Sequence, residues 1–364
     1  MSFNCGIVGL PNIGKSTLFN ALTQSSSAEA ANYPFCTIEP NMGKVPIRDQ
    51  RLKQIAAIAC SKKIIYNQLE IVDIAGLVKG ASKGEGLGNK FLSHIREVDA
   101  IVHLLRCFIN DDINHVHNEV DPISDAEVVE KELILADIDS IEKRLPQMEK
   151  NAKQGDKELK KQLDLMQEVL ATLKSGKPAR SLKNVDEEEM KLFQLLTTKP
   201  VMYVCNVEDA NVITGNELSK KVEKMAEANK SKFYCISANL EEDIANLESE
   251  EEKQSFLSEF GLQESGLDGV ARIMYEVLNM ITFFTVGPKE ARAWPVKVGS
   301  TANKAAGVIH TDFEKGFIKA ETISFEDYIK YGSESACKDA GRIRFEGRDY
   351  VVQDGDIMHF RFNV

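Results

Sequence analysis

The sequence lacks the features that mark membrane and secreted proteins. None of its apolar runs approaches the roughly 20 residues that a membrane-spanning helix needs, and its first residues do not show the basic and then apolar pattern of a signal peptide. Its seven cysteines are scattered, mostly within apolar segments, and none forms a Cys-x-x-Cys pair. We therefore expect reduced thiols in a cytoplasmic protein that does not enter a membrane.

An excess of basic residues is also missing. The 364 residues carry a net charge of −11, which argues against a surface coated for nucleic acid and leaves room only for a local basic groove. Hydrophobic residues make up 43% of the chain and charged residues 28%, as in ordinary globular proteins. A chain of this length is expected to form two or three domains.

The most informative stretch, residues 9–16, has the pattern Gly-x4-Gly-Lys-Ser of a phosphate-binding loop. The apolar residues 4–8 before it predict a buried strand, and residues 16–22 after it predict the start of a helix. In that context, backbone N–H groups and the positive end of the helix dipole bind phosphate. Lys15 is then expected to contact the β- and γ-phosphates, and Ser16 to offer its hydroxyl to Mg²⁺. The pattern predicts a nucleoside triphosphate site.

Two later segments fit the switch regions of such a site. Thr37 lies in a loop bounded by Pro34 and Pro40, where switch proteins place the hydroxyl that meets Mg²⁺ and the γ-phosphate. Residues 69–76 predict an apolar strand with Asp73 at its end, and that carboxylate is expected in the Mg²⁺ environment. The N–H group of Gly76 is expected to sense the γ-phosphate, because no side chain blocks its approach.

Leu77 occupies the position where Ras-like GTPases carry the Gln that orients the attacking water. A leucine side chain cannot hydrogen-bond water, so hydrolysis is expected to be slow unless another group or a partner helps. His115 follows the buried strand predicted over residues 100–107, and it is our candidate for positioning the water. His115 and His117 have no Cys or third His near them in sequence, so a surface loop is a better interpretation of the pair than a metal site.

Two helical seams follow from about residue 128. Apolar residues recur at intervals of three and four over residues 134–148 and again over residues 159–173, with a polar turn at residues 151–156 between them. Charged and polar residues dominate the other positions, as in a coiled coil. We predict an antiparallel coiled-coil hairpin; an ordinary helical layer on the core is the alternative.

The expected base-recognition motifs lie on the next two strands, residues 199–206 and 232–238. GTPases carry Asn-Lys-x-Asp and Ser-Ala there, and here the residues are Asn206, Val207, Glu208 and Asp209, then Ser237 and Ala238. Val207 removes the Lys that would cover a guanine base. Asp209 keeps a carboxylate at the fourth position, so GTP is not excluded.

A helix expected at residues 269–280 closes the nucleotide-binding domain. The remainder of the chain predicts a separate small domain. Strands are expected at residues 282–286, 292–296, 317–322, 342–345, 350–352 and 357–362, and helices at residues 303–309 and 325–331. A four- or five-stranded sheet over one main helix is typical of a ubiquitin-like β-grasp fold. Its basic residues either line a groove or belong to a solvated face of mixed charge.

Taken together, the motifs resemble those of the Obg-like ATPase family. The matching residues are 9–17, 32–40, 73–77, the glycine-rich run 80–89 and the C-terminal segment 354–362. The resemblance implies a nucleotide domain interrupted by a coiled coil, a C-terminal TGS domain, ATP preferred over GTP, and association with the ribosome. It also implies a hydrophobic residue in place of the catalytic Gln, here Leu77. The family pattern Asn-x-x-Glu differs at Asp209, which puts the nucleotide preference in question.

The predicted fold class is α/β: a P-loop NTPase domain with an inserted antiparallel coiled-coil hairpin and a C-terminal β-grasp (TGS) domain. The expected ranges are 1–127 and 200–281 for the nucleotide-binding domain, 128–199 for the helical insertion and 282–364 for the TGS domain. The expected function is a slow, Mg²⁺-dependent switch ATPase that binds the ribosome, its large subunit and RNA as a monomer. A GTPase of the same architecture and an RNA- or protein-binding scaffold are the alternatives.

The predicted site residues fall into three groups. The catalytic candidates are Lys15, Leu77 and His115, and the metal candidates are Ser16, Thr37 and Asp73, with Asn12 also placed to help hold a K⁺ ion beside the phosphates. The nucleotide-binding candidates are Asn12, Ile13, Gly14, Lys15, Ser16, Thr17, Gly76, Asn206, Val207, Glu208, Asp209, Ser237 and Ala238.

Overall fold

The structure, a computed structural model, describes residues 3–30, 42–74, 87–110, 119–153, 156–183 and 185–363. The chain divides into two compact units. The large unit contains residues 3–44 and 70–270, and the small unit contains residues 45–69 and 271–364. The expected ranges placed residues 45–69 in the nucleotide-binding domain and the helical insertion in a domain of its own. In the structure, residues 45–69 belong to the small unit, and the helical insertion belongs to the large one.

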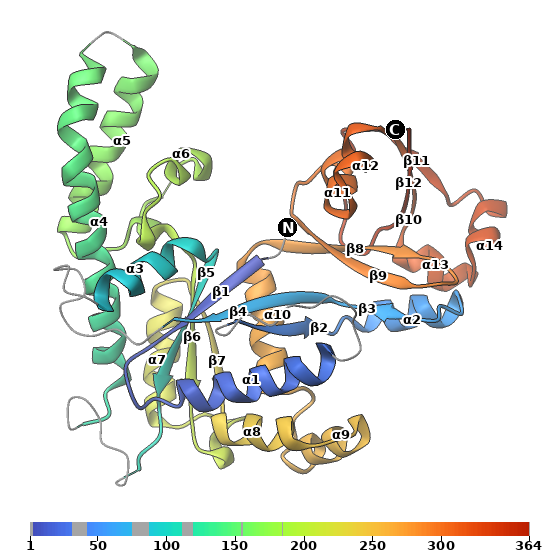
Figure 1. Cartoon of the computed structure of the whole chain (residues 1–364), viewed down its shortest axis with the longest axis horizontal. Helices are drawn as coiled ribbons and strands as arrows, with labels where there is room; N and C mark the ends of the chain where they lie inside the picture. Colours follow the sequence, from blue (N-terminus) through green and yellow to red (C-terminus); the bar gives the residue numbers. More distant parts are fainter. Residues whose placement is uncertain are drawn as a thin grey trace. The chain divides into compact units, whose positions relative to one another are not determined.

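The large unit is built on a six-stranded sheet in the order β2-β4-β1-β5-β6-β7 (Figure 1). Strands β1, β5, β6 and β7 pair in parallel, and β5 and β6 are buried along their whole length, as expected for central strands whose two faces are covered by helices. The strands are β1 (Phe3–Val8), β2 (Met42–Ile47), β4 (Asn67–Asp73), β5 (Ala100–Arg106), β6 (Val201–Asn206) and β7 (Lys232–Ile236). Because parallel strands end at the same edge, the residues that follow β1, β4, β5 and β6 converge there.

Helices connect these strands. Helices α1 and α8 lie side by side, and α7 packs on β6 and β7 (Figure 1). The connecting helices of the large unit are α1 (Lys15–Ala30), α3 (Leu87–Glu97), α6 (Glu187–Lys191), α7 (Glu217–Ala228), α8 (Ala238–Asn246) and α9 (Glu250–Glu259), with short 3-10 turns at Ala179–Ser181, Leu196–Thr198 and Asp209–Asn211. Helix α10 (Gly266–Val277) begins in the large unit and ends in the small one.

The predicted coiled-coil hairpin is present as α4 (Pro122–Ala152) and α5 (Lys157–Lys174). Asp121 and Asp156 cap the two helices, since each carboxylate accepts hydrogen bonds from backbone N–H groups of the first turn. The predicted seams meet in one buried cluster that includes Ile141, Met166 and Leu173. Helix α4 begins earlier than the pattern indicated, because its first half packs on β5 and α7 before the coiled coil starts.

The small unit has a second six-stranded sheet, in the order β11-β10-β12-β8-β9-β3. Its strands are β3 (Ile64–Ile65), β8 (Met280–Val286), β9 (Ala291–Lys297), β10 (Phe317–Ile323), β11 (Arg344–Glu346) and β12 (Ile357–Phe362). One buried cluster joins the sheet to α11 (Ala302–Ile309), which α12 (Thr311–Lys315) follows. A second joins it to α2 (Gln50–Ile58), α13 (Phe325–Tyr331) and α14 (Glu334–Asp339).

Three details of the small unit and of helix α10 differ from the sequence-based expectation. The sheet has a sixth strand, β3, which comes from the segment between β2 and β4 and pairs in parallel with β9. Helix α10 starts three residues earlier than expected and ends before Asn279, whose φ of +56° is incompatible with a continuing helix. The strand expected at residues 350–352 is reduced to a single bridge at Val351, because tight turns close on either side of it.

Candidate nucleotide-binding site

The phosphate loop connects β1 to α1, as the sequence pattern predicts. Gly14 has a φ of +88°, a conformation that L side chains rarely adopt, and its carbonyl accepts the first helical hydrogen bond, from the N–H of Leu18 at 3.0 Å. Gly9 allows a close approach, because a Cβ there would lie 2.6 Å from the carbonyl oxygen of Leu104. The loop therefore depends on glycine at both positions, and it opens α1 at Lys15.

Lys15 and Asp73 form an ion pair across the site. The Lys15 ammonium donates hydrogen bonds to the Asp73 carboxylate and, at 3.0 Å, to the carbonyl oxygen of Ile74. Both side chains are largely shielded from solvent, with 13% and 24% of their surface exposed. Strand β4 thus delivers a carboxylate to the phosphate loop, at the place where the sequence predicts the metal environment.

Asn206 connects the loop to the base-recognition segment. Its amide Nδ2 donates to the carbonyl oxygen of Ile13 at 2.9 Å, and its Oδ1 accepts from the N–H of Ala238 at 2.9 Å. The side chain is buried, with 5% of its surface exposed. Asn206 therefore holds β6, the phosphate loop and the start of α8 in one arrangement, and it acts as a positioning residue.

Glu208 and Asp209 have different surroundings. The Glu208 carboxylate accepts hydrogen bonds at 3.2 Å from the Ile109 N–H and from the side-chain amides of Asn211 and Asn216. Burial opposes its charge, but these hydrogen bonds outweigh that effect and lower the pKa of Glu208. The Glu208 carboxylate is thus hydrogen-bonded to the neighbouring turns. The Asp209 carboxylate accepts a hydrogen bond from the Ser237 hydroxyl and also faces the pocket.

The turn after β5 completes the pocket, and sequence reasoning missed it. Arg106 is almost fully buried and donates to the carbonyl oxygens of Phe108 at 3.3 Å and Asn110 at 3.1 Å. Its guanidinium lies 4.6 Å from the centre of the Phe108 ring. Burial lowers the pKa of Arg106, and Asp125 opposes that shift. Its position could have predicted this role, because the turn follows the strand beside β6, at the edge where parallel sheets bind ligands.

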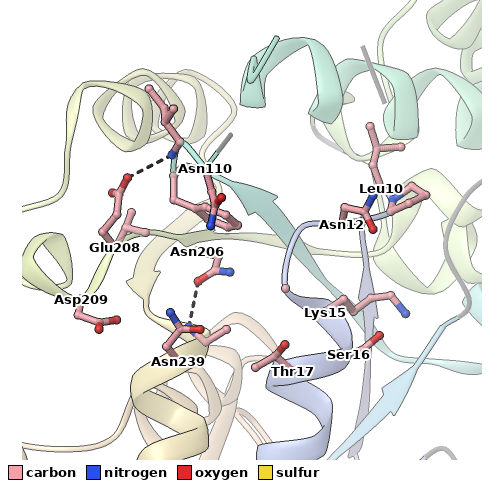
Figure 2. Close-up of a pocket in the computed structure, with 16 residues that line it drawn as sticks. Leu10, Asn12, Lys15, Ser16, Thr17, Asn110, Asn206, Glu208, Asp209 and Asn239 are labelled. Carbon is pink, nitrogen blue, oxygen red and sulfur yellow. Dashed lines mark hydrogen bonds between the residues drawn. The ribbon is translucent and has the colours of Figure 1, made fainter. Parts of the chain in front are cut away.

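These elements enclose a pocket of about 900 Å³. Figure 2 shows Lys15, Ser16 and Thr17 near one end of it, Glu208 and Asp209 at the other, and Asn206 between them. The volume is that of an ordinary small-molecule site. The residues that line it are Leu10, Pro11, Asn12, Gly14, Lys15, Ser16, Thr17, Phe108, Ile109, Asn110, Asn206, Val207, Glu208, Asp209, Ala238 and Asn239.

The remaining predicted residues divide into two groups. Ile13, Ser237 and Asp73 do not line the pocket, but each is hydrogen-bonded to a residue that does. Their partners are Asn206, Asp209 and Lys15, respectively. Thr37, Gly76, Leu77 and His115 lie outside the described residues. Among the residues that the structure describes, no three His, Cys, Asp or Glu side chains cluster as a metal site, and no helix is long and apolar enough to span a membrane.

The fold and the site define the class of protein. A parallel sheet with a Gly-x4-Gly-Lys-Ser loop after β1, an acidic residue at the end of β4 and an Asn-containing segment after β6 is a P-loop nucleoside triphosphatase domain of the GTPase type. Two family models agree: one described as "50S ribosome-binding GTPase" matches residues 4–136, and YchF-GTPase_C, described as "Protein of unknown function (DUF933)", matches residues 280–363.

Relatives extend this similarity to the whole chain. The sequence is 53% identical over 367 residues to the "Ribosome-binding ATPase YchF" of Haemophilus influenzae and 50% identical over 368 residues to that of Bacillus subtilis, with 100% of each chain covered. The structure entitled "Structure of the Schizosaccharomyces pombe YchF GTPase" matches with a TM-score of 0.89 at 36% identity, covering 99% of this chain and 98% of that one. The chain belongs to the YchF family.

Proposed function

We propose that this protein binds ATP with Mg²⁺, hydrolyses it slowly to ADP and phosphate, and associates with the ribosome in a manner that depends on the bound nucleotide. The observation that carries the proposal is the pocket itself, which has a phosphate loop at one end and the segment 206–209 at the other. The bacterial relatives named above support both parts, since they are named ribosome-binding ATPases.

The described residues have clear roles in triphosphate binding. The Lys15 ammonium neutralises phosphate charge, and the loop N–H groups and the start of α1 bind phosphate oxygens. The Ser16 hydroxyl and the Asp73 carboxylate are oxygen donors of the kind that Mg²⁺ prefers. Asp73 is paired with Lys15 in the structure, so binding of a magnesium nucleotide requires these two side chains to exchange partners. Mg²⁺ supplies charge neutralisation of the phosphates when it is bound.

Several parts of the site remain predictions. Thr37 completes the metal environment, the Gly76 N–H contacts the γ-phosphate, and His115 replaces the missing Gln at Leu77 as the group that positions water. Asn12 lines the pocket beside the loop with a φ of +63°, and a comparison of hydrolysis in K⁺ and Na⁺ tests whether it helps to hold a monovalent cation. We further propose that the protein acts as a monomer.

The base end of the pocket favours ATP over GTP. Guanine presents two adjacent donors to a carboxylate, and GTPases add a Lys over the base. Here Val207 replaces the Lys, and Glu208 is engaged by Ile109 and two Asn side chains. One of the two carboxylate oxygens of Asp209 is hydrogen-bonded to the Ser237 hydroxyl. The Phe108 ring provides an apolar face for either purine. The second candidate, a GTPase, rests on Asp209 and on the GTPase names of the family model and of the Schizosaccharomyces pombe structure.

Side-by-side titration with labelled ATP and GTP tests this preference. We expect tighter binding of ATP, and the variant Val207→Lys should move the ratio of the two dissociation constants toward GTP. Tighter binding of GTP by the unmodified protein would establish the second candidate. Lys15→Ala should weaken ATP binding by at least roughly tenfold, because it removes a charge-assisted contact of about 1.5–3 kcal/mol. Lys143→Ala, an exposed lysine on α4, is the matched control and should leave it unchanged.

Co-sedimentation with purified ribosomes and ribosomal subunits tests the partner. We expect the full-length protein to sediment with them, less strongly as salt rises, and to a different extent with ATP and with ADP. If the protein stays in the supernatant at low salt with either nucleotide, the ribosome part of the proposal is wrong. Nucleotide binding is measured separately, so that result would leave the ATPase part standing.

A further inference from the structure

The charge of the chain is divided unequally between its two units. Residues 45–69 and 271–364 contain 18 Lys and Arg against 14 Asp and Glu, a net charge of +4. The whole chain has 45 Lys and Arg against 56 Asp and Glu, which leaves 27 basic and 42 acidic residues for the large unit, a net charge of −15. The overall acidity therefore belongs to the large unit. The positive excess of the small unit comes from residues 45–69, which contribute five basic residues and one acidic residue.

Three lysines from two distant segments meet on the small unit. Lys62 and Lys63 precede β3, and Lys289 lies in the turn between β8 and β9. The N–H of Lys62 donates to the carbonyl oxygen of Pro288 at 3.2 Å, and the N–H of Ala291 donates to the carbonyl oxygen of Lys63 at 2.9 Å. The Ser61 hydroxyl adds a hydrogen bond to the carbonyl oxygen of Gly287 at 2.8 Å. These bonds fix the backbones that carry the three lysines against each other.

The side chains of this lysine cluster (Lys62, Lys63 and Lys289) are exposed and form no ion pair or hydrogen bond with any described residue. Glu290 is the acidic neighbour in the same turn, so the cluster keeps a net positive charge. The hairpin shows a different arrangement: there Lys143, Lys161 and Lys174 are also exposed but are paired with Asp139, Glu189 and Glu142. The cluster thus concentrates like charge, at a cost in self-repulsion, without an internal partner to offset it.

We propose that the lysine cluster binds the phosphate backbone of ribosomal RNA. The proposal rests on the ribosome association proposed above and assigns part of it to a defined surface. Exposed ammonium groups without partners suit a phosphate backbone, which carries closely spaced negative charges and needs no base-specific geometry. A single small anion is a poorer match, because Lys62, Lys63 and Lys289 are exposed surface side chains and do not enclose it.

The experiment compares two triple variants of the full-length protein with the same change in net charge. Lys62→Gln, Lys63→Gln and Lys289→Gln remove the cluster; Lys143→Gln, Lys161→Gln and Lys174→Gln remove the paired lysines of the hairpin. Binding to whole ribosomes and to deproteinised ribosomal RNA is measured over a range of salt concentrations. Three phosphate contacts contribute about 0.7–0.9 each to the slope of log K against log salt. The slope measured for the cluster variant should therefore be less steep than that of the unmodified protein by about 2–3. Its binding should be roughly 100-fold weaker at 0.1 M salt.

The outcomes separate the two proposals. If the unmodified protein binds ribosomes and the cluster variant keeps its slope, or the hairpin variant loses as much, the cluster assignment is wrong and the ribosome association stands. If the cluster variant loses affinity for ribosomes but not for deproteinised RNA, the surface contacts a ribosomal protein and the RNA assignment is overturned. Absence of ribosome binding by the unmodified protein would refute the ribosome part of the proposed function, and with it the cluster assignment. Unchanged ATP affinity of both variants verifies that they are folded.

Discussion

Gly14→Ala is expected to damage the site in a way that the structure allows us to dissect. A Cβ at residue 14 would lie 2.3 Å from the Nδ2 atom of Asn206, where real contacts exceed 3 Å. Residue 14 also has a φ of +88°. The substitution therefore adds backbone strain and pushes Asn206 away from both of its partners, Ile13 and Ala238.

The two effects can be estimated separately. Backbone strain for an L residue at positive φ is about 1–2 kcal/mol. Each of the two hydrogen bonds of Asn206 contributes about 0.5–1.5 kcal/mol, and a buried amide left without partners costs more. We expect Gly14→Ala to lower the free energy of unfolding by about 2–5 kcal/mol. Gly176→Ala is the matched control, because Gly176 has a φ of +81° and nothing within 4 Å of its added Cβ. It should cost only the strain, about 1–2 kcal/mol.

Urea denaturation and ATP titration of the two variants provide the measurement. Gly14→Ala should weaken ATP binding at least roughly tenfold, because the loop N–H groups move with Ile13, whereas Gly176→Ala should leave it unchanged. In the background of Asn206→Ala, the extra cost of Gly14→Ala should shrink toward that of the control, since the clashing atom is gone. Equal destabilisation by both alanines, together with unchanged ATP affinity, would refute the role assigned to Asn206.

Three further predictions concern stability and turnover. Burial, and to a lesser extent Arg180, lower the pKa of His103 from 6.5 to about 3. As the pH drops below about 6.5, the unfolded chain therefore takes up a proton that the folded chain does not. The free energy of unfolding should fall accordingly, by about 2 kcal/mol at pH 5. His103→Phe should remove that loss in denaturation curves at pH 5 and 7.5, and an unchanged pH dependence would contradict the reasoning. Asp137 is 1% exposed and accepts hydrogen bonds from two backbone N–H groups. Thermal denaturation should therefore show that Asp137→Ala lowers the free energy of unfolding by about 2–5 kcal/mol. Asp139→Ala, on the exposed face of the same helix, should lower it by at most about 0.5 kcal/mol. Because Leu77 cannot orient water, steady-state hydrolysis by the purified protein should stay below about 1 s⁻¹, and a faster basal rate would count against the slow-switch hypothesis.

Local sequence signals were sufficient for much of the site and the hairpin. The spacing of Gly9, Gly14, Lys15 and Ser16 specifies a loop between a strand and a helix, because glycine is needed where φ is positive or backbones approach closely. The heptad seams specify two helices that bury one narrow face, and the structure confirms that hairpin. In both cases the physical constraint lies within a few residues along the chain, so the pattern can be recognised without knowing the fold.

Other features depend on contacts between segments far apart in sequence. Residues 45–69 read as a continuation of the first domain, yet β3 pairs with β9, and Leu52 and Ile55 are buried in the core of the small unit. Strand pairing depends on which edge is free in the folded sheet, and a two-residue strand has no pattern of its own. The same holds for Phe108, which reaches the pocket only because the turn after β5 lies beside the one after β6. Glycine and heptad spacing thus determined the phosphate loop and the hairpin, whereas only the packing of distant strands decided that Phe108 lines the pocket and which lysines share a surface.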